Sequence, residues 1–335
     1  MADSAFLALV AVIALALAFD FTNGFHDTAN AVATSVATRA LDPRAAIIMA
    51  TAFNFIGAFA GTAVAKTIGS GLVDDSTTTT GVVAAALVGA IVWNLITWNY
   101  GLPSSSSHAL IGGLLGATLV ASGVGSFKLD GIVNKVLLPM FASPVIGYFL
   151  ALALVVALFW IFARAPRRPM TTVFRRLQIL SAGFMAFSHG SNDAQKTMGI
   201  LTLALIAAGT LAPGSDVPVW VIVAAATAIS LGTAVGGWRI MHTMGHRVAK
   251  LEPVHGFAAQ TTAGSVILVA AHFGMPVSTT HVITGAIMGV GSAHGVRGVR
   301  WGVARSILLG WLITIPFAGA VAAAAWFALH FIGLG

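Results

Sequence analysis

The sequence predicts an all-α polytopic membrane protein: an inverted-topology repeat with about 10–12 membrane segments, some of them re-entrant or broken. Composition is the first observation. Of the 335 residues, 58% are hydrophobic and 8% are charged, whereas soluble domains carry about 25% charged residues. The second observation is an internal duplication of polar, glycine-containing motifs within apolar sequence. Duplicated, interrupted segments of this kind are typical of the midplane site of a secondary transporter.

The apolar runs give the predicted segments, since a helix needs about 20 residues to cross a bilayer. In the first half they lie at 4–22, 45–67, 81–101, 106–122 and 133–163. In the second half they lie at 178–190, 196–211, 218–238, 257–273, 277–292 and 303–331. Several runs are too short or too rich in glycine for a simple span, and these hold the motifs. We therefore expect 21–40 and 187–211 to be partly re-entrant.

Basic residues set the predicted orientation. Arg and Lys gather in four loops, near 39–44, 164–176, 239–250 and 297–305, whereas the loops at 74–80 and 212–218 have none. The positive-inside rule places the four basic loops in the cytoplasm and both termini outside. An odd number of crossings in each half then inverts the second half. The predicted divisions are a first transmembrane repeat at 1–163, a basic cytoplasmic linker at 164–178 and a second, inverted repeat at 179–335.

The first duplicated motif places a carboxylate inside the membrane twice. It reads FTNGFHDTAN at 21–30 and FSHGSNDAQK at 187–196, which aligns Asp27 with Asp193. A charge at the bilayer centre costs at least about 2.5–3.5 kcal/mol, so acids there usually bind an ion or a proton. We predict Asp27 and Asp193 as ion-coupling acids, grouped with Asn23 and Asn192. The alternative is a structural ion pair or a neutral, hydrogen-bonded acid.

The second duplicated motif predicts an anion site. It reads GLPSSSSHALIGGLLG at 101–116 and GMPVSTTHVITGAIMG at 274–289. Pro followed by Ser or Thr starts a helix, and such a start offers free N–H groups, hydroxyl donors and the positive end of the dipole. The alternative is N-capping, and the glycines spaced by four predict close helix packing. The predicted substrate contacts are Ser105, Ser106, Ser107, Ser278, Thr279 and Thr280.

Other charged and titratable residues of the motifs leave alternatives open. Lys196 aligns with Asn30, and its ammonium either pairs with Asp193 or reaches the anion; we include Lys196 and Asn30 among the substrate contacts. Asp20 has no acidic counterpart, because Ala186 occupies that position. The motif histidines, His26, His108, His189 and His281, either relay a proton or are structural. Carboxylates beside an anion site indicate symport, since each charge enters more easily with the other.

At these motifs the sequence resembles the inorganic phosphate transporter (Pit) family, whose hallmark is a duplicated Gly-x-Asn-Asp-type motif. It stands here as GFHD at 24–27 and GSND at 190–193. The resemblance covers nearly the whole chain and implies an inverted-repeat helical symporter of phosphate. It also implies that Asp27 and Asp193 are the ion-coupled acids and that the Ser and Thr residues of the second motif contact phosphate.

Departures from the family pattern indicate the coupling ion. His26 stands where many relatives have Asn, and neutral Asn54 and Gln260 stand where sodium-coupled relatives tend to carry Glu. The sequence therefore resembles the bacterial low-affinity, proton-coupled branch, which takes up phosphate largely as a neutral metal–phosphate complex. The alternatives are a Na⁺-coupled phosphate or sulfate symporter and, from another class, an intramembrane hydrolase. No nucleophile–base arrangement supports a hydrolase, so no enzyme activity is expected.

The expected ligands and location follow from this resemblance. We expect no cofactor; the coupling ion is H⁺ or alternatively Na⁺, and Mg²⁺ or another divalent cation travels with phosphate. The sequence does not identify metal ligands. The expected partners are inorganic phosphate, the lipid bilayer and a second copy in a homodimer, with no nucleic acid. The expected location is a prokaryotic inner membrane.

Overall fold

The computed structural model describes residues 2–74 and 76–331, and nearly all of them are helical, as predicted. The α-helices are α1 (Ala2–Ala37), α2 (Pro43–Gly57), α3 (Ala63–Ser70), α4 (Thr80–Tyr100), α5 (Ser106–Ser122), α6 (Leu129–Gly131), α7 (Leu138–Ile161), α8 (Arg167–Ala207), α9 (Val219–Val235), α10 (Trp238–His242), α11 (Pro253–His272), α12 (Thr279–Gly291) and α13 (Trp301–Phe331). Two π-helical segments extend helices, η2 (Ile132–Leu137) before α7 and η3 (Thr243–Arg247) after α10.

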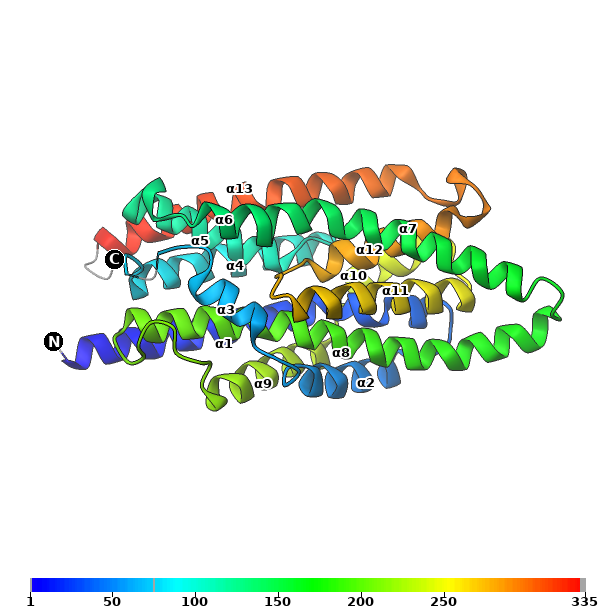
Figure 1. The fold of residues 1–335 in the computed structure, drawn as a ribbon, viewed down its shortest axis with the longest axis horizontal. Coiled ribbons are helices and arrows are strands. Elements are labelled where there is room, and N and C mark those ends of the chain that lie inside the picture. Colours follow the sequence, from blue (N-terminus) through cyan, green and yellow to red (C-terminus); the bar gives the residue numbers. More distant parts are fainter. Residues whose placement is uncertain (1, 75, 332–335) are drawn as a thin grey trace.

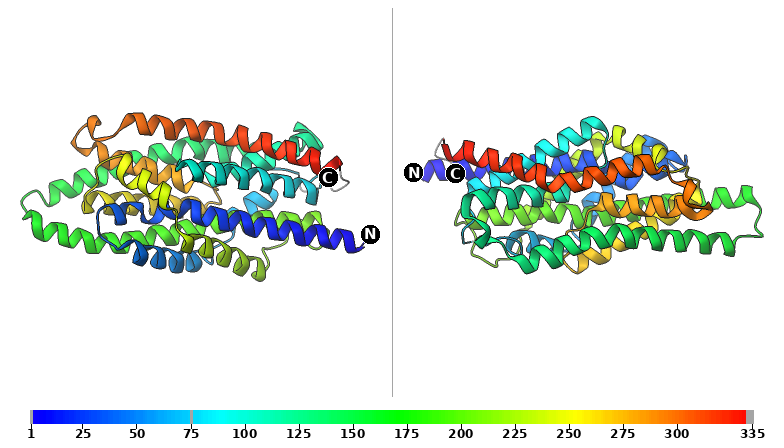
Figure 2. Two further views of the ribbon diagram at one scale, coloured as in Figure 1. Left: turned by 180° about the vertical axis from the view of Figure 1, so that it is seen from behind. Right: turned by 90° about the horizontal axis from the view of Figure 1, so that it is seen from above.

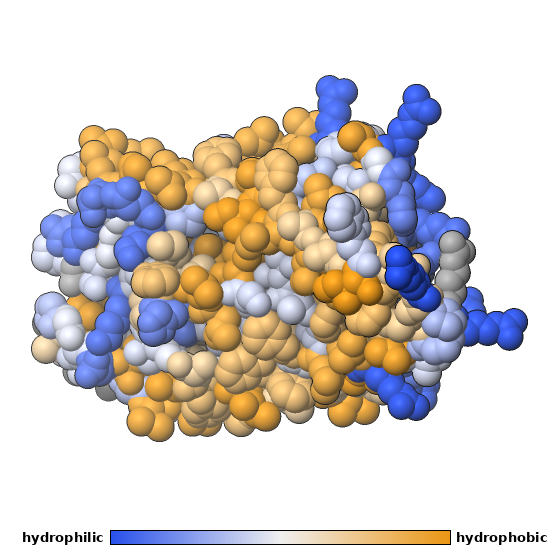
Figure 3. All heavy atoms as spheres, turned by 45° about the vertical axis from the view of Figure 1, so that its right-hand side comes forward, coloured by the Kyte–Doolittle hydropathy of each residue, from blue (hydrophilic) through white to orange (hydrophobic). Residues whose placement is uncertain are grey.

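The helices form an elongated bundle with an apolar belt (Figures 1 and 3). Five helices of the described part are long and apolar enough to cross a membrane. They are the segments Phe6–Ala37, Thr80–Tyr100, Leu129–Ile161, Pro253–His272 and Trp301–Phe331. The pair α9 and α10–η3 makes a sixth candidate if it counts as one span, and it bends by 62° at its break. Several predicted segments are therefore broken, which agrees with the predicted fold class.

The prediction that 21–40 and 187–211 are re-entrant is wrong. The first acidic motif lies inside the unbroken helix α1 and the second inside the unbroken helix α8. A helix of 36 residues is about 54 Å long and passes through the whole hydrocarbon core of about 30 Å. The motif glycines serve helix contact instead: a Cβ on Gly24 would lie 2.2 Å from Ile229 O, and one on Gly190 2.2 Å from Asn54 O.

The real interruptions produce two helical hairpins that enter from opposite ends of the bundle (Figure 1). Helices α4 and α5 pack against each other as one hairpin, and α11 and α12 form the other. Each hairpin packs on a helix of the other half, because α5 lies against α13 and α12 against α7. The glycines spaced by four permit this approach, as predicted: a Cβ on Gly112 would lie 2.6 Å from Ile315 O, and one on Gly285 2.3 Å from Pro144 O.

Both ends of the bundle repeat the same local arrangement. At one end a bridge joins Val73 to Phe127, and at the other a bridge joins Ala249 to Val299. The start of α1 and the end of α13 lie at the first end, and the connection from α7 to α8 lies at the second (Figures 1 and 2). Most of the predicted linker at 164–178 is helical, since α8 begins at Arg167. The end of the chain, 332–335, lies outside the described residues, so its predicted outside position is not tested here.

Candidate functional site

The site begins at the tips of the two hairpins, where the sequence folds as its motifs predict. Gly101 and Gly274 have φ of 63° and 67° and turn the chain after α4 and α11; glycine adopts this left-handed conformation without steric cost. Ser105 then caps α5, its hydroxyl accepting from His108 N at 3.1 Å. Ser278 caps α12 in the same way, accepting from His281 N at 3.2 Å. Capping is therefore part of the role of both serines.

A polar centre forms where these tips meet the motif segments of α1 and α8. On the α1 side, His26 Nδ1 lies 2.6 Å from Asp27 Oδ1. The hydroxyl of Ser106 donates to the same oxygen at 3.4 Å, and that of Thr279 reaches Asp27 Oδ2 at 3.5 Å. Asp27 therefore contacts both hairpins. Its contacts are an imidazole and hydroxyls, and none is a fixed positive charge.

On the α8 side, Asp193 is paired with a lysine. Lys196 Nζ donates to Asp193 Oδ1, to the Ser107 hydroxyl and to Val277 O. His189 Nε2 lies 3.1 Å from Asp193 Oδ2. Lys196 therefore pairs with Asp193 and also contacts Ser107, one of the predicted phosphate contacts.

Thr279 joins the two acids. Its hydroxyl lies 3.2 Å from Asp193 Oδ2 and 3.5 Å from Asp27 Oδ2, and one hydroxyl hydrogen serves only one of these acceptors at a time. Asn30 Nδ2 donates to Thr279 at 3.1 Å and to Thr280 at 2.9 Å. Residues far apart in the sequence therefore form one connected group.

The centre is closed in this structure. Asp27, Asp193 and Lys196 are 2%, 0% and 1% exposed, and the Ser and Thr residues of both tips are buried. The described interior contains three buried carboxyls, Asp20, Asp27 and Asp193, but Lys196 is its one buried ammonium or guanidinium. Buried charges are stable only when they are paired, so the centre needs additional positive charge when its acids are ionised.

The acids offer a ligand set for a metal ion. Ligand atoms of Asp27, His189 and Asp193 all lie within 4.8 Å of one another. Carboxylates bind Mg²⁺ together with phosphate oxygens in many proteins. The sequence did not identify metal ligands, and this cluster supplies candidates for a divalent cation that enters with its anion.

Two predicted ion-coupling residues lie outside this connected group. Asn192 Nδ2 donates to Met275 O at 3.2 Å and so holds the tip of the second hairpin. Asn23 is buried, and among the described residues neither its amide nitrogen nor its oxygen makes a contact with hydrogen-bond geometry. The structure therefore brings Asp27 and Asp193 together but leaves these two asparagines beside the centre.

Neutral Asn54 and Gln260 are fully engaged in protein contacts. Asn54 donates to Thr233 at 2.9 Å, and its oxygen lies 2.9 Å from His189 Nδ1. Gln260 donates to Ala31 O at 2.9 Å and accepts from Ser181 at 3.0 Å. Both amides therefore serve to hold helices and side chains in place.

Sequence reasoning missed a hydroxyl pair that supports His26. His26 Nε2 lies 3.0 Å from Thr97 Oγ1 and 3.3 Å from Ser104 Oγ. Thr97 lies in the apolar run of α4, where no repeated signal marks it. The contact of His189 with Asp193 carried a signal, because residues at i and i+4 share a helix face.

Matching threonines hold the two hairpin tips. The hydroxyl of Thr243, in η3, donates to Gly101 O at 2.9 Å. The hydroxyl of Thr67, in α3, donates to Gly274 O at 2.7 Å. We call these contacts the two tip latches; each joins a short segment after a helix break to the hairpin of the other half.

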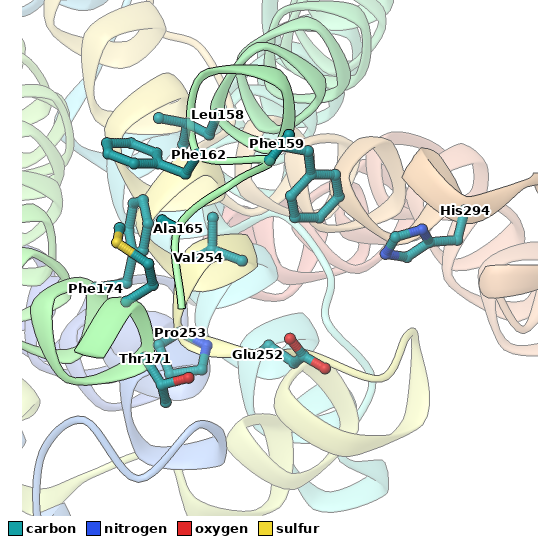
Figure 4. A pocket seen from close by; sticks show the side chains of 12 residues that line it. Leu158, Phe159, Phe162, Ala165, Thr171, Phe174, Glu252, Pro253, Val254 and His294 are labelled. Carbon is teal, nitrogen blue, oxygen red and sulfur yellow. The ribbon is translucent and has the colours of Figure 1, made fainter. Parts of the chain in front are cut away.

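A pocket of about 550 Å³ lies elsewhere, between the end of α7, the start of α8 and the start of α11 (Figure 4). Its lining is mainly Phe, Leu and other apolar side chains, and Glu252 is the one charged residue among them. An acid among apolar groups repels an anion, so this pocket does not suit a phosphate-like substrate.

The chain is similar to known proteins over nearly its whole length. A sequence model of the phosphate transporter family, PHO4, matches residues 23–322. A probable low-affinity inorganic phosphate transporter of Bacillus subtilis (strain 168) is 46% identical over 332 residues, covering 98% of this chain and 99% of the relative. One of Rhizobium meliloti (strain 1021) is 48% identical and covers 99% of each chain. A solved structure described as the sodium-dependent phosphate transporter matches with TM-score 0.86 and 28% identity, over 97% of this chain and 100% of that one.

Proposed function

Because the chain belongs to the phosphate transporter family, we propose that it is a proton-coupled symporter that imports inorganic phosphate as a metal–phosphate complex. The family identifies a transporter, not an enzyme, so the hydrolase alternative falls away. One observation carries the proposal for the site: two helix starts rich in hydroxyls converge on two buried acids.

The anion contacts are assigned from the hairpin tips. Ser106, Ser107 and Thr279 already turn their hydroxyls toward Asp27, Lys196 and Asp193. When phosphate enters, these hydroxyls and the free N–H groups of the two helix starts donate to its oxygens. Ser105 and Ser278 fix the helix starts as caps, and Asn30 positions Thr279 and Thr280.

The charge balance supports entry of phosphate together with cations. Phosphate would bring negative charge to a centre that already holds more carboxyls than ammonium groups. A divalent cation held by Asp27, His189 and Asp193 would neutralise the acids and the phosphate together. In this proposal the metal is part of the cargo, and a proton supplies the coupling charge.

Two features support a proton as the coupling ion. The imidazoles of His26 and His189 lie beside Asp27 and Asp193, and imidazole binds and releases protons near neutral pH. The amides of Asn54 and Gln260 bring no negative charge for Na⁺. Na⁺ coupling is the second candidate, because the matching solved structure is described as sodium-dependent.

We propose that the two tip latches alternate during transport. Release of the Thr67 contact frees the tip of the α11–α12 hairpin, and release of the Thr243 contact frees the tip of the α4–α5 hairpin. With 1–163 and 179–335 as inverted repeats, rocking of the halves would open each side in turn. We place the basic end in the cytoplasm of a prokaryotic inner membrane by the positive-inside rule; a homodimer remains an expectation.

The test is uptake of radiolabelled phosphate into proteoliposomes under a pH gradient or a Na⁺ gradient, each with and without Mg²⁺. The proposal expects uptake that follows the pH gradient, persists without Na⁺ and increases with Mg²⁺. Strict dependence on Na⁺ would replace the proton by Na⁺. Absence of phosphate uptake by correctly folded protein would overturn phosphate as the substrate.

A further inference from the structure

Asp20 is a buried acid that the repeat does not explain. It lies in α1 seven positions before Asp27 and is fully buried, at 0% exposure. Neither of its carboxyl oxygens has a hydrogen-bond partner in the described structure. An ionised carboxylate without partners is among the most unfavourable groups in a protein interior, so this carboxyl either carries a proton or binds a cation.

Two more unpaired polar groups surround this carboxyl. Asn23, one turn later in α1, has an unpaired oxygen and nitrogen, and the hydroxyl of Thr197 in α8 is also unpaired. Both side chains interact with the Asp20 carboxyl, although no contact reaches hydrogen-bond geometry, and the charges of Asp193 and Lys196 act on it from α8. Buried polar groups are hydrogen-bonded as a rule, so three unpaired groups around one carboxyl make this point a candidate cation site.

The donor set indicates which ligand fits. The Asp20 carboxyl, the Asn23 carbonyl and the Thr197 hydroxyl are all oxygen donors, which hard cations prefer. The set has a single carboxyl, which matches a single positive charge, whereas a divalent cation usually takes more acidic ligands or several waters. A structural role for Asp20 would be expected to show well-formed hydrogen bonds, whereas its contacts with Thr197 and Asn23 do not reach hydrogen-bond geometry.

We propose that Asp20, Asn23 and Thr197 form a separate binding site for one monovalent cation, a proton or Na⁺, and that this cation drives transport. The inference rests on the proposed function, since it assigns the coupling charge of that transporter to a second site. The metal of the cargo stays between Asp27 and Asp193. The equivalent position of α8 is Ala186, which has no carboxyl. The cation site therefore occurs in the first repeat only, and the two halves of the carrier differ in charge.

The test separates phosphate exchange from driven uptake. With equal phosphate on both sides, a carrier exchanges labelled for unlabelled phosphate and never needs to return empty. Net uptake needs the coupling cation to bind and leave in every cycle. Asp20→Asn removes the negative charge with almost no change in size. The matched control is Asp216→Asn, which changes an exposed loop acid paired with Lys66.

We expect Asp20→Asn to keep exchange near the wild-type rate and to lower driven uptake at least about tenfold, within the usual range of coupling energies. If the pH gradient no longer drives uptake by Asp20→Asn, the cation is a proton; if the Na⁺ gradient no longer drives it, the cation is Na⁺. Wild-type-like driven uptake by Asp20→Asn overturns the proposal. Loss of exchange together with uptake also overturns it, because Asp20 would then serve the transport path itself.

A second variant protects the test against a folding defect. Thr197→Val should raise the concentration of H⁺ or Na⁺ that half-activates uptake, and Thr197→Ser should restore it, since serine keeps the oxygen. The same half-activating cation concentration in the wild-type, Thr197→Val and Thr197→Ser proteins would contradict a cation site that includes Thr197. If the wild-type protein shows no phosphate exchange, the proposed function is wrong, but this result does not test the cation site. The cation site is then tested by measuring ²²Na⁺ binding and proton uptake in purified wild-type and Asp20→Asn protein.

Discussion

Asp27 and Asp193 occupy equivalent places in the two motifs, yet their surroundings differ. Asp193 contacts a lysine that lies one turn along the same helix, so its charge is matched within the protein. Asp27 contacts His26 and two hydroxyls, and the position equivalent to Lys196 is the neutral Asn30. Both acids lie in unbroken helices beside an imidazole, and the difference in fixed charge comes from Lys196 against the neutral Asn30.

This difference assigns separate roles to the two acids. A carboxylate with a permanent partner keeps its charge matched when cations enter and leave, so we propose Asp193 with Lys196 as the fixed anchor, whose other oxygen, Oδ2, faces the proposed metal position. A carboxylate without such a partner gains most when a transported cation arrives. We therefore propose that Asp27 is the acid of this pair whose state changes during transport, and the predictions below test that division.

The largest effect is expected from Asp27→Asn. The variant removes the charge that the incoming cation balances, so driven phosphate uptake should fall to background while membrane insertion stays intact. Uptake into proteoliposomes measures this, with Asp130→Asn, an exposed acid hydrogen-bonded to Asn134, as the control. Uptake at the wild-type level would remove Asp27 from the mechanism.

The next largest effect is expected from Lys196→Met. This variant leaves the buried Asp193 without its ammonium partner, and breaking a buried pair in this way costs about 3–5 kcal/mol. Thermal unfolding in detergent should show a clear loss of stability. The double variant Lys196→Met/Asp193→Asn should recover most of it, because no unpaired charge remains; a double variant as unstable as the single one would contradict the anchor role.

The hydroxyls around the acids come third. A hydrogen bond to a charged group contributes about 1.5–3 kcal/mol, so Ser106→Ala should raise the half-saturation concentration of phosphate about tenfold. Thr279→Val should raise it further, because Thr279 contacts both acids. Ser122→Ala, at the exposed end of α5, is the control. Unchanged half-saturation in both variants would argue against the anion site.

The tip latches should give the smallest effects. Each latch is a single hydrogen bond of about 1 kcal/mol, which corresponds to a change of roughly fivefold in an equilibrium. A cysteine at Ser107 in this cysteine-free chain reports opening through its reaction with a membrane-impermeant maleimide. Thr67→Val should speed labelling from outside and Thr243→Val from the cytoplasm. Equal changes from both sides would contradict alternating latches.

The sequence predicted the hairpin tips well because their signals are local. Pro103 and Pro276, followed by capping serines, mark where a helix starts, and the glycines spaced by four mark a close contact. These features depend on neighbouring residues only. The contact between Lys196 and Asp193, which are three positions apart on one helix, is also local, and the sequence offered it as one of two alternatives.

The remaining features depend on packing between distant segments. The motif of α1 looked like a break because it is polar, but the polar groups of His26 and Asp27 find partners on α4, α5 and α12 while the helix backbone stays intact. Thr97 became important only because α4 packs on α1. For the same reason the sequence could not predict that Asp20 and Thr197 lack hydrogen-bond partners, because that depends on which side chains of other helices pack around them.

The central claim is that the two hairpin tips meet at one site, and a cysteine pair tests it directly. Ser107 Oγ lies 3.4 Å from Val277 O, so a disulfide between Ser107→Cys and Val277→Cys should form on oxidation. A protease site inserted in the exposed connection at 162–166 makes the result visible on a gel. The positive control is Lys66→Cys/Asp216→Cys, an exposed pair across the two halves, joined by a flexible bis-maleimide because the lysine side chain spans more than a disulfide does. The account predicts that the cleaved halves stay joined until they are reduced and that phosphate slows the cross-link; halves that separate while the control pair stays joined would contradict it.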